Sequence, residues 1–246
     1  MKDISPQDLA ALLKKSKKAV AITGAGISVE SGIPDFRSKG GLWERFDPLE
    51  YATIRAFERN PAKVWGMLKE MDRILVSARP NPAHYALAEL EKQGILLGVI
   101  TQNVDNLHQA AGSVNVVEYH GNAHRFTCLH CKGHWPRAAL DFDETPLYCH
   151  CGGLIKPDVV FFGEAIPEAA MRQANAWALS SDLLLIIGSS LEVAPANMLP
   201  QAAKSTNAII VESNMEQTRM TRYLTDYFLE GPAGVVWPEV MKELEG

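Results

Sequence analysis

The sequence predicts an α/β protein built on a doubly wound, Rossmann-like parallel sheet, with a small cysteine-containing module and a helical insertion. Short apolar runs rich in β-branched residues alternate with stretches of helical composition, which is typical of a parallel sheet covered by helices. Glycine-rich or polar turns follow several of these runs. Ligands of such sheets bind beyond the carboxyl ends of the strands, so the residues of these turns are the candidates for function.

The predicted elements can be placed in order along the chain. An amphipathic helix comes first, and strands are expected at residues 19–23, 96–101, 114–119, 159–161, 183–188 and 208–212. Helices, each with proline near its start, are expected at residues 82–93, 167–180 and 195–204. The alternation breaks at an aromatic, helical stretch and at the cysteines. We therefore expect a Rossmann-like domain of residues 1–39, 79–121 and 155–246, a helical insertion of residues 40–78 and a metal module of residues 122–154.

The composition limits the class of protein. With 246 residues, 47% of them apolar, the chain can bury an ample core. A net charge of −5 argues against general attraction to nucleic acid or anionic lipid, since both need a basic surface. The amino terminus lacks an apolar stretch of signal-peptide length, and no apolar run approaches the ~20 residues of a membrane span. We expect a cytoplasmic protein with no membrane partner and no general nucleic-acid binding.

The cysteine spacing predicts a small zinc-binding module. Four thiolates in two close pairs are the ligand set that tetrahedral zinc prefers, and disulfides are disfavoured in the cytoplasm. The expected ligands are Cys128, Cys131, Cys149 and Cys151. The second pair is one residue tighter than usual, so His130 or His150 is an alternative ligand. No open ligand position is evident, which favours a structural Zn²⁺ over a catalytic one.

A glycine turn after the first strand is suited to phosphate. Gly24, Ala25 and Gly26 form the turn, and Ser28 adds a hydroxyl; backbone amides in such a loop can face a phosphate group. The dinucleotide fingerprint is incomplete, because Val29 stands where a third glycine is expected. A tight turn without a ligand is therefore the alternative.

Two further segments strengthen the nucleotide interpretation. Asp35, Phe36 and Arg37 set a carboxylate, a ring and a guanidinium in succession, and arginine suits phosphate oxygens. A second strand-end turn offers hydroxyls suited to ribose or phosphate. It consists of Gly188, Ser189 and Ser190.

Polar residues at two other strand ends are candidates for catalysis. His120 ends an expected strand, and Gly121 after it permits close backbone approach. A neutral imidazole there can accept a proton from a sugar hydroxyl. Asn103 and Asp105 follow the strand at residues 96–101 and together can grip a carboxamide, although Asp105 can also simply cap a helix. The other histidines are expected to pack in helices or to face solvent.

The chain resembles the sirtuins, the NAD-dependent protein lysine deacylases, in motifs that occur in the family's order from about Val20 to Pro238. These motifs are GAGIS, SGIPDFR, TQNVDNLH, HGN, the paired cysteines, KPDVVFFGE and GSSLEVAPA. The resemblance implies a reaction that consumes NAD as a co-substrate. The acyl oxygen of a modified lysine attacks the ribose anomeric carbon, nicotinamide leaves, and the acyl group ends on ADP-ribose.

The resemblance also implies roles for individual residues. His120 is expected to be the general base, and Asn103 and Asp105 are expected to hold the nicotinamide and its ribose. Phe36 would cover the anomeric carbon, and Asn214 would meet the adenosine ribose, with Glu212 as the alternative. The implied cofactor-binding residues are Gly24, Ala25, Gly26, Ser28, Asp35, Phe36, Arg37, Gln102, Asn103, Asp105, Gly188, Ser189, Ser190, Asn214 and Ala233.

The same resemblance implies a peptide substrate. Sirtuins hold an extended acyl-lysine peptide by strand addition, which reads mostly main chain. The matching residues are Val160, Phe161, Phe162, Gly163, Glu164, Leu191 and Val193. Family members that remove succinyl groups carry a tyrosine and an arginine where this chain has Leu68 and Met71. We expect acetyl or longer apolar acyl groups to be preferred, because an acidic acyl group would be left unpaired in an apolar pocket.

Three alternatives stay open. A zinc-containing NAD oxidoreductase could use the same sheet but normally has the full glycine fingerprint. Mono-ADP-ribosyl transfer could use the same NAD site. A zinc-ribbon module for nucleic acid would need more lysine and arginine around the cysteines than residues 122–154 contain.

Overall fold

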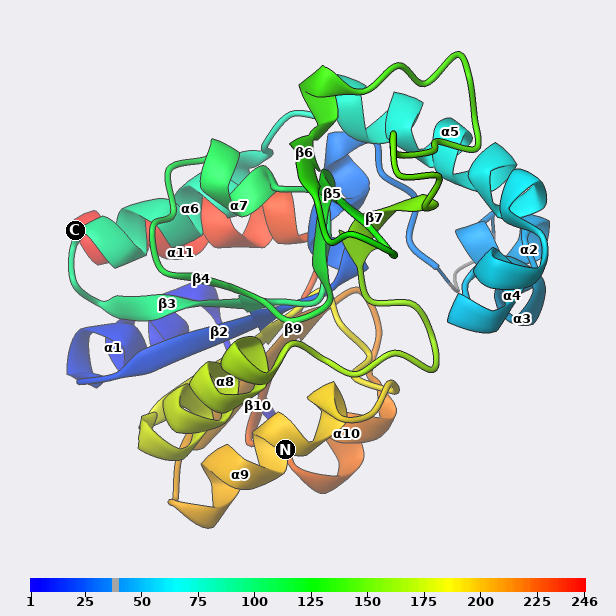
Figure 1. Ribbon diagram of the computed structural model, residues 1–246. Helices are drawn as coiled ribbons and strands as arrows, with labels where there is room; N and C mark the ends of the chain where they lie inside the picture. The colour runs from blue at the N-terminus through cyan, green and yellow to red at the C-terminus, as the bar shows by residue number, and fades with distance from the viewer. Residues whose placement is uncertain (37–39) are drawn as a thin grey trace.

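A seven-stranded parallel sheet forms the centre of the protein in the computed structural model, which describes residues 1–36 and 40–246 (Figure 1). Its strand order is β1-β10-β9-β8-β2-β3-β4. The strands are β1 (Lys2–Asp3), β2 (Ala19–Thr23), β3 (Leu96–Thr101), β4 (Val116–Glu118), β8 (Leu183–Ile187), β9 (Ile209–Asn214) and β10 (Tyr227–Glu230). All neighbouring pairs run parallel. The predicted doubly wound sheet is confirmed.

The strand order reverses direction at β2. On one side β2 pairs with β3, which leads to β4, and on the other side it pairs with β8, which leads to β9 and β10. The loops that leave β2 and β8 therefore diverge from neighbouring positions at one edge of the sheet. Such a switch point opens a crevice at the carboxyl ends of the strands.

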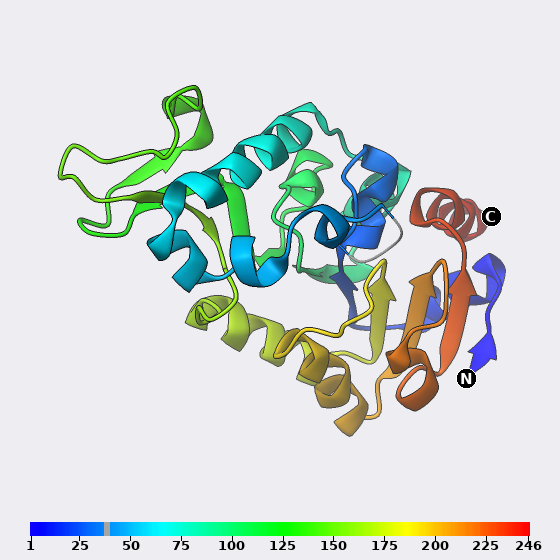
Figure 2. The ribbon, with the colours of Figure 1, turned by 90° about the vertical axis from the view of Figure 1, so that its right-hand side faces the viewer.

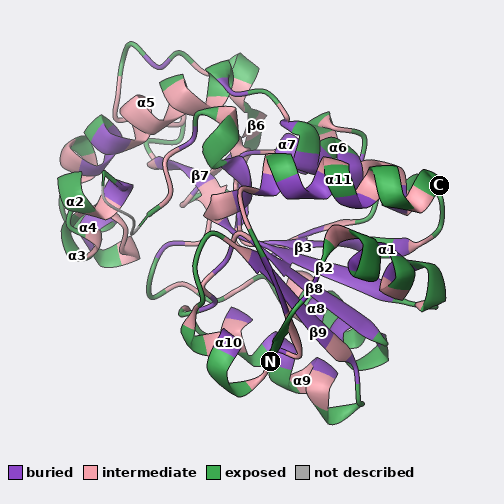
Figure 3. Cartoon of the chain, turned by 180° about the vertical axis from the view of Figure 1, so that it is seen from behind, coloured by how far each residue is buried: buried purple, intermediate pink, exposed green. Residues whose placement is uncertain are grey.

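Helices cover both faces of this sheet (Figures 1 and 3). One face carries α1 (Pro6–Lys15), α6 (Pro82–Lys92) and α11 (Ala233–Glu245), and the other carries α8 (Glu168–Ser180) and α9 (Leu199–Ser205). Because both faces are covered, β2 and β8 are buried throughout, as their continuous apolar sequences predict. Short helical segments, namely η1 (Ala25–Ser31), α7 (Leu107–Ala110), η2 (Arg137–Ala139), η3 (Ala196–Met198) and α10 (Arg219–Tyr223), fill the connections. Among the described helices, none combines the length and the apolar character needed to cross a bilayer.

A smaller lobe lies beside the sheet and has its own core (Figure 2). It contains α2 (Leu42–Arg45), α3 (Pro48–Tyr51), α4 (Ile54–Arg59), α5 (Pro61–Ser77) and an antiparallel sheet of β6 (His134–Pro136), β5 (Gly121–Cys128) and β7 (Ile155–Val159). Aromatic rings join the helices to the strands: Trp65 of α5 stacks on Phe126 of β5, with centroids 6.2 Å apart, and meets Phe142 edge-on. The helical insertion and the cysteine segment thus share one apolar cluster.

The sequence-based element predictions were accurate for the central strands and wrong at one place. The strand expected at residues 159–161 does not join the main sheet; β7 ends at Val159 and pairs antiparallel with β5 instead. Local composition indicates a strand but not its partner, which here is set by the cysteine segment. The pattern also did not predict β10 and α11. Strand β10 is only four residues long, and α11 contains Pro238, which obscures its helical signal.

Candidate active site

Two turns pack backbone against backbone at the switch point. Gly24 N donates to Ile187 O (3.1 Å), and Gly26 N donates to Gly188 O (2.8 Å). A Cβ on Gly26 would lie 2.7 Å from Gly188 Cα, and Gly188 itself has a φ of +59°. Side chains are therefore excluded from this contact, and Val29, in place of the third fingerprint glycine, is 45% exposed and needs no close approach.

A cavity of 1340 Å³ opens from these turns toward the smaller lobe. It is larger than the several hundred Å³ of ordinary ligand pockets, as a dinucleotide with a second substrate would require. The residues expected at the site that line it are Gly24, Ala25, Gly26, Ser28, Asp35, Phe36, Gln102, Asn103, Asp105, His120, Val160, Phe161, Phe162, Gly163, Glu164, Gly188, Ser189, Ser190, Leu191, Val193, Asn214 and Ala233. The expected phosphate ligand Arg37 lies outside the described residues.

Three buried polar side chains form a connected group beneath the cavity. Ser28 Oγ donates to Asp105 Oδ2 (2.7 Å), and Asn103 Nδ2 donates to Ser28 Oγ (3.1 Å) and to Gly24 O (3.0 Å). Asp105 Oδ1 accepts from Leu107 N (2.9 Å), so this carboxylate also caps α7. Both amide hydrogens of Asn103 are engaged, which leaves its Oδ1 as the group that can accept a hydrogen bond from a ligand.

His120 is held as a neutral base at the cavity wall. Its Nδ1 lies 3.1 Å from Gln102 O, and because a carbonyl only accepts, Nδ1 carries the proton and Nε2 is the acceptor. Burial of the ring lowers the pKa of His120 below its usual value, although the Gln102 carbonyl opposes this shift. Gln102 is fixed in turn, since its Nε2 donates to Ser189 Oγ (2.7 Å).

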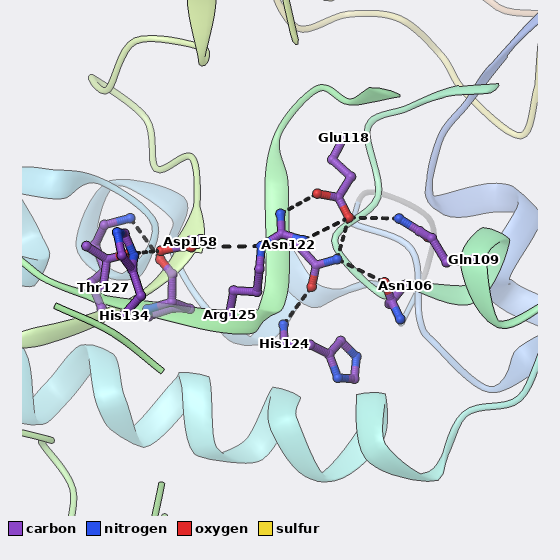
Figure 4. Close-up of polar contacts among 11 residues, drawn as sticks. Asn106, Gln109, Glu118, Asn122, His124, Arg125, Thr127, His134 and Asp158 are labelled. Atoms are coloured by element: carbon purple, nitrogen blue, oxygen red, sulfur yellow. Dashed lines mark hydrogen bonds and ion pairs between the residues drawn. The ribbon is translucent and has the colours of Figure 1, made fainter. Parts of the chain in front are cut away.

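Strand β5 contacts the loop that carries Asn103 and Asp105. Buried Asn122 donates from Nδ2 to Asn106 Oδ1 (3.0 Å) and to Glu118 Oε1 (2.5 Å), and Arg125 forms an ion pair with the same Glu118 (Figure 4). His124 was expected in solvent, but it is half-buried, with Nε2 3.3 Å from Asp105 O. The cysteine-containing lobe therefore helps to position the loop that carries Asn103 and Asp105.

The sequence left open whether Glu212 or Asn214 meets a ligand. Glu212 is fully buried, whereas Asn214 lines the cavity. Glu216 also lines it and was missed; its place two residues beyond Asn214, in the turn after β9, was the available signal. Ala233 begins α11 at the same wall.

Both expected peptide edges, residues 160–164 and 191–193, line the cavity. Phe162 is 42% exposed, but its backbone already pairs with the helical insertion. Its N donates to Ala52 O (2.8 Å), and its O accepts from Ile54 N (3.1 Å). Glu164 braces this segment, because Oε2 accepts from Phe161 N (2.8 Å) and pairs with Lys156 at 3.0 Å.

The four cysteines fit a tetrahedral metal ion. Their Sγ atoms all lie within 4.8 Å of one another, and the group contains neither His130 nor His150. Two Sγ pairs, Cys128 with Cys151 and Cys131 with Cys149, are each 3.6 Å apart, and no disulfide is formed. Zinc–sulfur bonds of about 2.3 Å place thiolates roughly 3.8 Å apart, so this donor set suits structural Zn²⁺.

The fold and the site together define a Rossmann-like, nucleotide-binding type of protein with a four-cysteine metal-binding module. The sequence model of the Sir2 family matches residues 24–195, and the chain belongs to this family, the sirtuins. It is 48% identical to "NAD-dependent protein deacylase 2" of Pyrobaculum aerophilum over 97% of this chain and 95% of that protein.

Solved structures agree. The structure of a Sir2 homologue–NAD complex has a TM-score of 0.92 at 39% identity and covers 99% of this chain and 95% of its own. A Sir2 variant with a deacetylated p53 peptide and 3′-O-acetyl ADP-ribose has a TM-score of 0.90 at 33% identity, covering 98% of both chains.

Metal removal tests the cysteine cluster. We expect one zinc ion per chain. The variant Cys149→Ala should lose both the metal and the structure of the smaller lobe, because structural zinc sites contribute about 10–16 kcal/mol of apparent binding energy to folding. Zinc content by atomic emission and near-UV circular dichroism measure the two effects. His150→Ala is the matched control and should keep the metal; loss of zinc from this variant would contradict the four-thiolate assignment.

Two buried histidines should make stability depend on pH. Burial lowers the pKa of His84 to about 4, although Asp105 opposes the shift, and burial lowers that of His108 well below its usual value. Protonation therefore favours the unfolded chain: the stabilisation is complete above the unfolded pKa of about 6.5 and is lost as the pH falls toward about 4.

Denaturant unfolding at about pH 7.5 and about pH 5 should show a loss of about 2 kcal/mol for each such histidine. His84→Gln should reduce the slope, whereas a change at exposed His134 should not. An unfolding free energy that is flat over this range would show that the two rings protonate freely.

Proposed function

We propose that the protein is an NAD-dependent protein lysine deacylase. The observation that carries the proposal is the shared cavity. It is lined by the neutral His120, by the loop that carries Asn103 and Asp105, and by apolar side chains such as Phe162. NAD supplies an electrophilic ribose carbon when nicotinamide leaves, and the acyl oxygen of the modified lysine is the nucleophile. Relatives and neighbouring structures named for deacylation and for NAD support this assignment.

The residues divide the work between the two ends of the dinucleotide. At the nicotinamide end, Asn103 Oδ1 accepts from the carboxamide, and Ser28 and Asp105 hold Asn103 in place. His120 Nε2 takes the proton of a ribose hydroxyl, a contribution of about 100- to 10,000-fold in rate. Phe36, 38% exposed and stacked on Trp43, covers the reacting carbon against water.

The remaining ligand contacts lie along the switch point. Backbone groups of the Gly24–Gly26 turn face the phosphates, with Arg37 beside them, and Ser189 and Ser190 approach the adenosine. Asn214 accepts from the adenosine ribose, and the backbone at Ala233 meets adenine. Each of these described groups lines the same cavity, which supports a single bound dinucleotide.

The peptide partner lies extended between residues 160–164 and residues 191–193. Because Phe162 already uses its own backbone N and O, strand addition falls to neighbouring groups such as those of Gly163. A few main-chain contacts at each edge give loose sequence preference.

We also propose that the protein works in the cytoplasm, where a reducing environment keeps the metal-binding cysteines as thiols. The division into Rossmann-like domain, helical insertion and metal module remains a prediction at its stated limits.

The acyl pocket is expected to be apolar. Helix α5 contributes Trp65, Leu68 and Met71 to the cavity. Arg137, a cation beside this helix, is already held by Asp72 through bonds of 2.9 and 2.6 Å. A succinyl carboxylate would therefore be buried without a partner.

Nicotinamide release tests the reaction. With an acetyl-lysine peptide and NAD, the protein should release nicotinamide and form acylated ADP-ribose, without a change in nicotinamide redox absorbance. His120→Ala should lower kcat/KM by about 100-fold or more while retaining zinc. NAD that stays intact with every acyl-lysine peptide would refute the proposal, and hydride transfer would indicate an oxidoreductase.

The acyl preference is tested with peptides that differ only in the acyl group. Acetyl and longer apolar groups should exceed succinyl in kcat/KM by at least about tenfold, given the cost of an unpaired buried charge. The double variant Leu68→Tyr with Met71→Arg should narrow this difference. Equal efficiency of the unaltered protein on succinyl and acetyl peptides would be the contrary result.

A further inference from the structure

Glu212 is a buried carboxylate that is held by hydrogen bonds alone among the described residues. It lies on β9 with no exposed surface, and no described lysine, arginine or histidine forms an ion pair with it. Three neutral donors hold it: Asn214 Nδ2 at 2.9 Å, Thr221 Oγ1 at 2.6 Å and Thr225 Oγ1 at 3.1 Å. Burying a carboxylate without a cation costs free energy of folding, so we expect Glu212 to have a role in the neighbouring site.

The two oxygens of this carboxylate serve different neighbours. Oε2 accepts from Thr221 and Thr225 and so fastens the segment around α10 to the sheet. Among the described residues, Oε1 accepts only from Asn214, at the cavity wall. The structural part and the site-directed part of Glu212 can therefore be altered separately.

The contact through Oε1 fixes the orientation of the Asn214 amide. Its Nδ2 donates to Glu212 Oε1 and also to Ser189 O (3.1 Å). A carboxylate and a carbonyl can only accept, so turning the amide over would place Oδ1 against two oxygens and lose both hydrogen bonds. A free asparagine offers a ligand either a donor or an acceptor, whereas this one offers an acceptor alone.

We propose that Glu212 is a positioning residue that orients Asn214 so that its Oδ1 accepts a hydrogen bond from a hydroxyl of the adenosine ribose. The inference rests on the proposed function, which places that ribose at Asn214. Glu212 does not touch the ligand. Its effect is on NAD binding and not on chemistry at the distant anomeric carbon.

The test is a cycle that combines Glu212→Leu with NAD analogues lacking the 2′- or the 3′-hydroxyl of the adenosine ribose. In the unaltered protein, removing the recognised hydroxyl should raise KM about tenfold, the size of one lost hydrogen bond. Glu212→Leu should raise KM for NAD about tenfold with kcat retained. If Glu212 acts through that hydroxyl, Glu212→Leu assayed with the deoxy analogue should raise KM about tenfold in total, and not about a hundredfold.

Two companion variants separate orientation from folding. Glu212→Gln keeps the shape but offers Asn214 either an oxygen or an amino group, so its effect should be intermediate and on KM. Thr225→Val is the matched control, because it removes a donor to Oε2 and should lower the melting temperature. Its KM for NAD should stay within about twofold of the unaltered protein, and the deoxy analogue should still raise that KM about tenfold. If Glu212→Leu does not fold, the cycle is decided with Glu212→Gln.

Independent effects that multiply in the cycle would overturn the proposal, as would an unchanged KM in both Glu212 variants. The same cycle is measured by calorimetry with ADP-ribose and its deoxy forms, which needs no turnover. An unaltered protein that binds ADP-ribose but never releases nicotinamide would sink the proposed function while leaving this inference testable.

Discussion

The rest of the site depends on one steric constraint, the contact between the turn after β2 and the turn after β8. Gly24 and Gly26 lie so close to Gly188 that a Cβ on Gly24 or Gly26 would meet backbone atoms within 3.0 Å. The contact brings the carboxyl ends of the two central strands together and leaves backbone groups exposed to the cavity. From the loop that follows β3, Asn103 donates to Gly24 O and Gln102 donates to Ser189 Oγ.

Three polar side chains around this contact each use one polar atom for a hydrogen bond within the protein and leave another polar atom available to a ligand. His120 is bonded through Nδ1 and keeps Nε2 free to accept, and Asn103 and Asn214 each use their amide nitrogen internally. The orientation is fixed before any ligand arrives, which lowers the cost of ordering the site on binding. Acceptors that cannot donate, such as the Glu212 carboxylate and the Gln102 carbonyl, face the donor atoms of Asn214 and His120, so the acceptor atoms of these two side chains stay available.

The smaller lobe contributes in two ways to the same cavity. Its aromatic core presents Trp65, Leu68 and Met71 of α5 as an apolar wall, while β5 holds the loop that carries Asn103 and Asp105, with Ala123 N donating to Val104 O at 2.9 Å. The thiolate cluster closes the far end of this lobe, in which Cys128 is buried within the aromatic core. A metal ion held by these thiolates would stabilise the lobe from outside the cavity, since none of the four cysteines lines it.

The sequence by itself determined the sheet class, the central strands and the paired cysteines, because periodicity, strand-end turns and ligand spacing are local properties. Cavity residues such as Phe162, Asn214 and Ala233 were expected only from the resemblance to the sirtuins. Only the tertiary structure decided that β7 pairs with β5, that His124 contacts the loop at Asp105, and that Glu212 lies behind Asn214 rather than at the ligand. Strand pairing, side-chain direction and burial depend on partners far away in the chain, and no local pattern specifies which partner is present.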